Sequence, residues 1–174
     1  MQNFEKYHPI MSRHYNLDWL TNFKLKDILA MRHMRDIAIA QGRPIDTEIT
    51  ETAHFVNRAM ALVMANRALL YGVGTRGADD LLATFGIYGF STDQRCATVR
   101  MAAPATADPA VLAEVLPRMI GFAVHELGLT RMVAGQIVRP ADRELYLANH
   151  FTEQSDGQLE LHAEDVVDLP TYRF

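Results

Sequence analysis

The sequence predicts a single α+β domain over residues 1–174, with a mixed, mostly antiparallel sheet flanked by helices. Two helical patterns precede three consecutive strand patterns, and the short polar connections between those strands are typical of antiparallel hairpins. A helix–strand–helix pattern follows over residues 108–151, and the strand before it would complete a βαβ unit. The length of 174 residues is enough to bury one full core.

The first part of the chain predicts one strand and two helices. Residues 15–20 alternate polar and apolar side chains, which favours a short strand. Thr21 or Asn22 can cap a helix that ends at Gly42–Pro44, and Thr50 can cap a second helix. The predicted buried face of the second helix is formed by Ala53, Val56, Met60 and Val63.

Three strands are predicted next, at Ala68–Thr75, Leu81–Phe90 and Arg95–Ala103. The end of the first, Gly72–Gly77, matches the spacing G-x-G-x-x-G that binds dinucleotides where a helix follows. A strand pattern follows here instead, so the glycines are better explained by a strand end and a turn. Dinucleotide binding is the weakest of the functional alternatives.

The helix–strand–helix segment has clear boundaries. Asp108–Pro109 is typical of a helix start, and Gly128 suits the left-handed position after a helix end. The short apolar stretch Arg131–Val138 predicts a buried strand, and Pro140–Phe151 predicts a second helix. Gln158–Val167 predicts one or two closing strands, and an edge strand there could support a homodimer.

Composition and charge argue against several classes of function. The net charge of −4 gives no basic face for nucleic acid. One cysteine excludes an internal disulfide framework and suits a reducing compartment. No signal peptide is recognisable and no apolar run approaches ~20 residues, so we expect a cytoplasmic protein without membrane contact. The seven histidines lack the close spacing of a metal site, so no metal is expected.

Two passages resemble the GNAT (Gcn5-related N-acetyltransferase) family. Phe122–Met132 is similar to the family's helix-to-strand passage, commonly written A-x-x-x-L-G-L-x-R-I. Leu145–Phe151 resembles its closing helix, in which a tyrosine lies five residues before the phenylalanine of a Gly-Phe pair. The order of elements over Tyr15–Leu161 also looks like the branch that acetylates ribosomal-protein N-termini. The resemblance implies direct acetyl transfer from acetyl-CoA to an amine on a small molecule or peptide.

The resemblance also implies a site. A backbone N–H of Val99–Ala102 would hydrogen-bond the thioester carbonyl, where this strand and the strand of Val133 separate beside Asp108. Tyr146 would be the acid that protonates the departing thiolate. The residues implied in coenzyme binding are Val99, Met101, Ala102, Ala107, Ala110, Val111, Arg139 and Arg143. The first two helices would wall the acceptor pocket, and Met31, Met34, Met60 and Met64 would make it pliable and apolar.

One departure from the family concerns the pyrophosphate. Family members carry Q/R-x-x-G-x-G/A before the first helix of this segment, whereas Ala105–Leu112 contains no glycine. The carboxylate of Asp108 would occupy free N–H groups at the helix start, and Pro109 has none to offer. A diphosphate would also meet a like charge. The alternative function is therefore a non-catalytic GNAT-fold protein with a degenerate coenzyme loop, acting in interaction or regulation.

Overall fold

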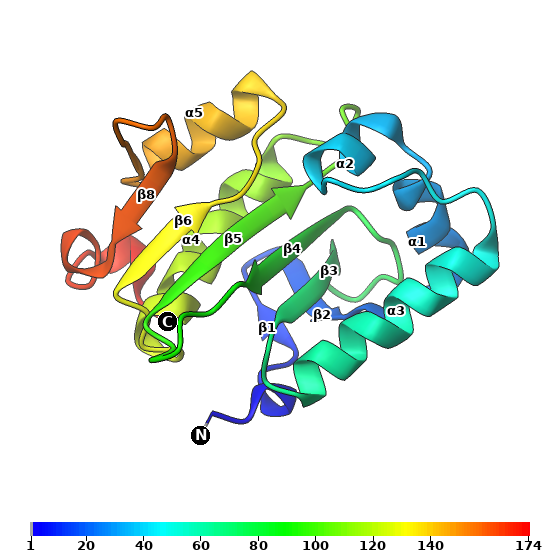
Figure 1. The fold of residues 1–174 in the computed structure, drawn as a ribbon, viewed down its shortest axis with the longest axis horizontal. Coiled ribbons are helices and arrows are strands. Elements are labelled where there is room, and N and C mark those ends of the chain that lie inside the picture. The colour runs from blue at the N-terminus through cyan, green and yellow to red at the C-terminus, as the bar shows by residue number, and fades with distance from the viewer. Residues whose placement is uncertain (1) are drawn as a thin grey trace.

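An eight-stranded sheet with the order β1-β2-β3-β4-β5-β6-β8-β7 runs through the molecule (Figure 1). The computed structural model describes residues 2–174. The strands are β1 (Ile10–Met11), β2 (Tyr15–Trp19), β3 (Leu69–Thr75), β4 (Ala83–Tyr88), β5 (Cys96–Ala102), β6 (Arg131–Ala134), β7 (Thr152–Glu153) and β8 (Leu159–His162). The helices are α1 (Leu25–Arg32), α2 (Arg35–Ala40), α3 (Ile49–Met64), α4 (Ala110–His125) and α5 (Pro140–Ala148).

The predicted hairpins and βαβ unit are confirmed. Strands β1 to β5 pair antiparallel in sequence order, with Trp19 opposite Tyr71 and Ile87 opposite Val99. Strand β6 then pairs parallel to β5 after the chain has crossed through α4. Gly128 has a φ of +69° just beyond α4, the left-handed conformation expected there.

The helices before β3 differ from the prediction in two ways. The first predicted helix is two helices, because Met34 is extended (ψ 127°) between α1 and α2. Asp46 fixes this break: its carboxylate holds Arg32 and its carbonyl oxygen lies 2.9 Å from Nδ1 of His33. The next helix starts at Ile49 rather than after Thr50, because Glu48 forms a capping box with Glu51.

The end of the sheet also differs from the prediction. Strand β6 stops at Ala134, so the second half of the predicted strand, 135–138, leaves the sheet. Strand β8 is an inner strand between β6 and β7, so Gln158–Val167 does not supply the sheet edge expected for a dimer. The two-residue strands β1 and β7, which the sequence pattern did not reveal, form the edges.

Successive residues of the central strands pack on opposite faces of the sheet. Leu69, Tyr71 and Val73 of β3 join the main core, which α4 covers from behind β5 and β6 in Figure 1. Leu70 instead packs with Ile28 of α1 in a smaller cluster. The helices α1 to α3 therefore lie on the sheet face opposite α4.

The glycines of β3 serve close packing. A Cβ on Gly72 would lie 2.6 Å from the Phe23 ring, and one on Gly74 would lie 2.5 Å from the carbonyl oxygen of Asp80. The next element, β4, is an antiparallel strand. No helix start follows these glycines to receive a pyrophosphate, which argues against dinucleotide binding.

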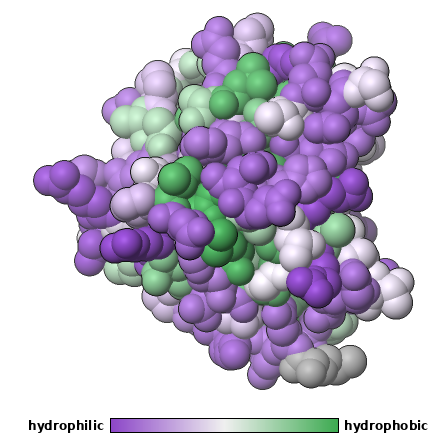
Figure 2. Space-filling view, turned by 90° about the vertical axis from the view of Figure 1, so that its left-hand side faces the viewer, coloured by the Kyte–Doolittle hydropathy of each residue, from purple (hydrophilic) through white to green (hydrophobic). Residues whose placement is uncertain are grey.

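The face on the β8 and α5 side, viewed in Figure 2, is mainly hydrophilic, with smaller apolar patches between charged and polar groups. Across residues 2–174, every helix is too short or too polar to cross a lipid bilayer.

Candidate active site

Strands β5 and β6 separate halfway along β5. Their last paired residues are Val99 and Ala134, and the N–H of Gly135 then donates to the Val99 carbonyl at 2.7 Å. Strand β5 continues for Arg100–Ala102, while the segment after β6 turns away towards α5. The separation that the sequence led us to expect is therefore present, one residue beyond Val133.

Gly135 lies at this opening, where a side chain would crowd its neighbours. A Cβ at this position would lie 3.0 Å from the Tyr88 hydroxyl and 3.3 Å from Nε of Arg100. Burial raises the pKa of Tyr88, and the nearby Arg100 lowers it only in part, so the phenol keeps its proton near neutral pH.

Tyr146 lies in the main core next to the free end of β5. Its side chain is buried and packs edge-on against Phe151, with ring centres 4.9 Å apart. Burial raises the pKa of Tyr146 far above its ordinary value, Asp142 raises it further, and the Met101 backbone counteracts this only in part. The hydroxyl is therefore protonated at every pH at which the protein would be assayed.

The other residues expected on β5 and at the start of α4 vary in accessibility. Val99, Met101, Ala102 and Val111 are buried, Ala107 is half-buried and Ala110 is exposed. Oδ1 of Asp108 accepts the N–H of Ala110 at 2.9 Å, as expected, although α4 begins at Ala110 with Pro109 rather than Asp108 at the N-cap position. The N–H of Ala107 donates to Pro104, so neither amide is free for an anion.

The two predicted phosphate-binding arginines are paired with carboxylates. Arg139 donates to both carboxylate oxygens of Asp142, at 2.9 and 2.7 Å, and to the carbonyl of Pro104 at 3.2 Å. Arg143 lies 2.8 Å from a carboxylate oxygen of Glu153. Arg139 thus ties the start of α5 to the β5–α4 loop.

Helix α2 covers the free end of β5. Ile37 packs with Ala102 in a small apolar cluster, and the Gln41 carbonyl accepts from Nη1 of Arg100 at 3.0 Å. The crevice between α2 and the start of α5 has a volume of only about 10 Å³. A coenzyme arm would need α2 to shift before it reached Met101.

A large cavity of about 710 Å³ lies between α1–α3 and β3–β5. Much of its wall is apolar, including Met31, Phe55, Leu70 and Leu81. Tyr88 and Arg100 also line it, so the cavity extends to the side chains beside Gly135. Of the four methionines predicted for an acceptor pocket, only Met31 is among its lining residues.

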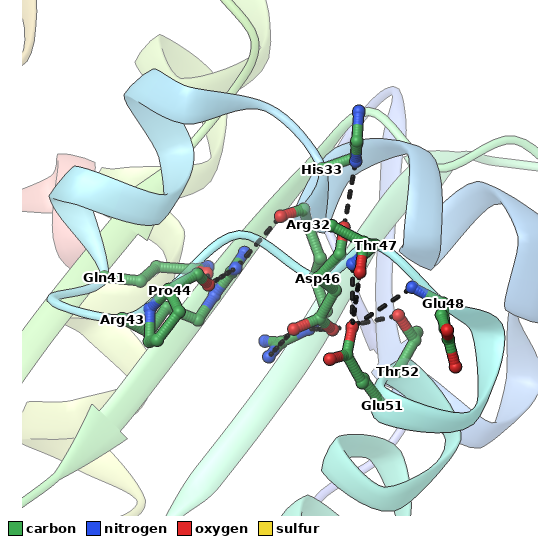
Figure 3. A network of polar contacts seen from close by, with 10 residues as sticks. All are labelled: Arg32, His33, Gln41, Arg43, Pro44, Asp46, Thr47, Glu48, Glu51 and Thr52. Carbon is green, nitrogen blue, oxygen red and sulfur yellow. Dashed lines mark hydrogen bonds and ion pairs between the residues drawn. The ribbon is translucent and has the colours of Figure 1, made fainter.

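A buried ion pair between Arg32 and Asp46, drawn in Figure 3, lies at one wall of this cavity. The carboxylate of Asp46 accepts Nε and Nη2 of Arg32 and, at 2.9 Å, the hydroxyl of Thr52. The guanidinium carbon of Arg32 also lies 3.6 Å from the ring centre of Phe55. This network links α1 and α3 through the segment 41–47.

Arg58 lines the cavity, and so do Arg43 and Arg100, which both donate to Gln41. Burial lowers the pKa of Arg43 to about 10, and the neighbouring Arg32 contributes to the shift. The side chain remains charged at neutral pH. Arg43 and Arg100 could not be recognised as a pair from the sequence, because they lie far apart in the chain and match no motif.

Comparison of the sequence with protein-family models and with curated proteins gives no match. The structure is similar to Mycobacterium smegmatis RimJ in complex with CoA-disulfide, with a TM-score of 0.70, 13% identity, and coverage of 91% of this chain and 86% of RimJ. It is also similar to the ribosomal-protein-S5-alanine acetyltransferase from Vibrio fischeri (TM-score 0.70, 13% identity, 90% and 97% covered). A third similar structure is spermidine N-acetyltransferase from Vibrio cholerae in complex with CoA and spermine (TM-score 0.73, 14% identity, 88% and 98% covered).

The chain has the GNAT fold. The fold predicted from the sequence is confirmed over nearly the whole chain. In this GNAT fold the opening between β5 and β6 adjoins the large cavity at Tyr88 and Arg100. Among the described residues, no group of three or more His, Cys, Asp or Glu side chains could hold a metal ion.

Proposed function

We propose that this protein is an acetyl-CoA-dependent N-acetyltransferase that transfers an acetyl group directly to an amine. The observation that carries the proposal is the free end of β5 at Arg100–Ala102, beside Tyr146 and within reach of the large cavity. Similar structures include proteins solved with coenzyme A bound, and one of them is a spermidine N-acetyltransferase. A cytoplasmic location belongs to the same proposal.

Bound acetyl-CoA would supply the acetyl group as a thioester. The acceptor nitrogen forms a bond to the carbonyl carbon as the carbon–sulfur bond breaks; the nitrogen loses one proton and the thiolate gains one. A backbone N–H of Arg100–Ala102 would donate to the carbonyl oxygen, where negative charge develops. Tyr146 would hold the proton for the thiolate. Because burial makes its phenol a weaker acid than usual, transfer to a thiolate with a conjugate acid near pKa ~8.5 needs the sulfur to lie in direct contact.

The residues of this chain suit one end of the coenzyme better than the other. The β5 backbone can receive a thioester, but the β5–α4 loop lacks the glycines that cradle a pyrophosphate in the family. A phosphate bound by Arg139 or Arg143 would compete with the carboxylate of Asp142 or Glu153 and lie beside its like charge.

A second function is favoured by the contact between Asp108 and the Ala110 N–H. A carboxylate there would repel a pyrophosphate at the start of α4, as expected for a GNAT-fold protein that has lost coenzyme binding. Such a protein would act in interaction or regulation.

Isothermal titration with acetyl-CoA separates the two functions. We expect saturable binding at micromolar to millimolar concentration and, with an accepted amine, release of free thiol. Absence of binding at millimolar acetyl-CoA would exclude the transferase and favour the non-catalytic protein.

A further inference from the structure

We infer that the acceptor is a small amine that also carries an anionic group, a carboxylate or a phosphate, and that Arg43 and Arg100 bind this group in the large cavity. The acetyl-transfer part of this inference rests on the proposed function, whereas anion binding by the cavity can be tested without acetyl-CoA.

The charges around the cavity are unbalanced. Four arginines line it, Arg32, Arg43, Arg58 and Arg100, against the two carboxylates of Asp46 and Glu51. Asp46 is occupied by Arg32 and Thr52, and Glu51 accepts the backbone N–H groups of Thr47 and Glu48. The cavity is therefore positive in a protein whose net charge is −4.

Arg43 and Arg100 both have unused hydrogen-bonding capacity. Within residues 2–174, neither forms an ion pair with a carboxylate. Nη2 of Arg43 and Nε of Arg100 are buried without an acceptor in the described part of the chain. A buried charged donor without a partner is costly. An anion in the cavity beside these guanidinium groups would offset the electrostatic part of that cost.

The two guanidinium groups are held on either side of one residue. The Gln41 side-chain oxygen accepts Nε of Arg43 at 2.6 Å, and its backbone carbonyl accepts Nη1 of Arg100 at 3.0 Å. Arg43 is fixed further by the carbonyls of Arg32 and Pro44, both at 2.9 Å. Arginine side chains held in this way can bind an anion without a large loss of conformational freedom.

The same charges would help the amine to react. A nearby positive charge disfavours an ammonium ion, so it lowers the pKa of the acceptor amine and raises the neutral fraction that can attack. The lowered amine pKa matters because Asp46 and Glu51, the two carboxylates at the cavity wall, are already engaged and are therefore poorly suited to accept the amine proton. The volume of about 710 Å³ suits a small molecule, and the apolar wall suits an uncharged body between its two polar ends.

Matched pairs of ligands test the inference. Binding of the standard amino acids is compared with that of their carboxamides, which differ only in the anionic group, by thermal shift and calorimetry without acetyl-CoA. Phosphoethanolamine and ethanolamine form the phosphate arm. We expect at least one acid to bind ten-fold or more tightly than its neutral partner, and inorganic phosphate to compete. Equal or weaker binding of every anionic member would overturn the inference.

Variants assign the effect to the two arginines. Arg43→Gln and Arg100→Gln should each remove most of the preference for the anion, whereas Arg43→Lys should retain part of it. Arg67→Gln removes the same charge at an exposed position that does not line the cavity and should leave the preference intact. A preference that survives in both glutamine variants would overturn the assignment. If a glutamine variant does not fold, competition by phosphate in the unmodified protein still decides.

Experiments with acetyl-CoA distinguish a failure of the proposed transferase function from a failure of the inference about the anion site. Acetylation of neutral amines without preference for their anionic partners would contradict the inference and leave the transferase standing. Tight binding of an anionic amine that is never acetylated would contradict the transferase and leave the anion site standing.

Discussion

Asp46 organises one wall of the large cavity, although no sequence motif marks this residue. It closes the break between α1 and α2, holds Arg32 and bonds to Thr52 on α3. Replacement by asparagine would leave the Arg32 charge buried without its counter-ion. We therefore expect Asp46→Asn to lower the free energy of unfolding by about 3–5 kcal/mol in urea denaturation. The exposed control Asp168→Asn should change it by less than about 0.5 kcal/mol.

The same carboxyl gives the stability a defined pH dependence. Burial alone would raise the pKa of Asp46, but the hydrogen bonds from Arg32 and Thr52 outweigh burial and hold it below the ordinary 3.8. A lowered folded-state pKa contributes stability above the ordinary value, and this is lost as the pH falls through the lowered value. The stability difference between the unmodified protein and Asp46→Asn should therefore shrink below about pH 4. A difference that stays constant from pH 7 to pH 3 would contradict this account.

Tyr146 is the residue on which the proposed proton transfer depends. Tyr146→Phe keeps the ring against Phe151 and removes only the hydroxyl, so we expect turnover to fall by about 10²-fold or more with little change in acetyl-CoA affinity. Tyr172→Phe is a matched control. It also removes a buried hydroxyl, which donates to Asn149, and it should leave turnover unchanged. Unchanged turnover in Tyr146→Phe would exclude this hydroxyl as the acid.

At the scale of elements, the start of α4 decides how well a coenzyme can bind. Asp108→Asn keeps a side chain that can accept the Ala110 N–H but removes the charge. We expect acetyl-CoA to bind several-fold more tightly to this variant by calorimetry, with a larger gain at low salt, because the removed repulsion is between exposed charges. If the variant and the unmodified protein bind acetyl-CoA equally well at low and at high salt, the pyrophosphate lies away from α4.

Most elements could be predicted because their signals are local. The hairpins follow from short polar turns, and α4 and α5 follow from Asp108–Pro109, Gly128 and Pro140. The break at Met34 could not be predicted, because it depends on Asp46, twelve residues further on. The two-residue edge strands β1 and β7 are too short to show an alternating pattern.

Over the whole molecule, the sequence offered candidate residues for the coenzyme side of the proposed site, but not the arginines of the cavity. Tyr146 could be named from its position before Phe151, because helix α5 is continuous in sequence. The cavity joins residues from α1, α3, β3, β4 and β5, and Arg43 and Arg100 both donate to Gln41. Such a charge cluster arises from the folding of distant segments, so periodicity and spacing carry no signal for it.

Helix α2 and the residues that follow it join the coenzyme side of the proposed site to the acceptor side. Ile37 covers Ala102 at the free end of β5, and Gln41 accepts hydrogen bonds from Arg43 and Arg100. If acetyl-CoA enters between β5 and β6, α2 must move. Saturating acetyl-CoA should then speed hydrogen exchange in residues 35–43 and slow it at Arg100–Ala102, while the buried end of α4 stays unchanged as an internal control. Coenzyme binding with unchanged exchange in residues 35–43 would mean that the coenzyme reaches the protein by a route that does not pass α2.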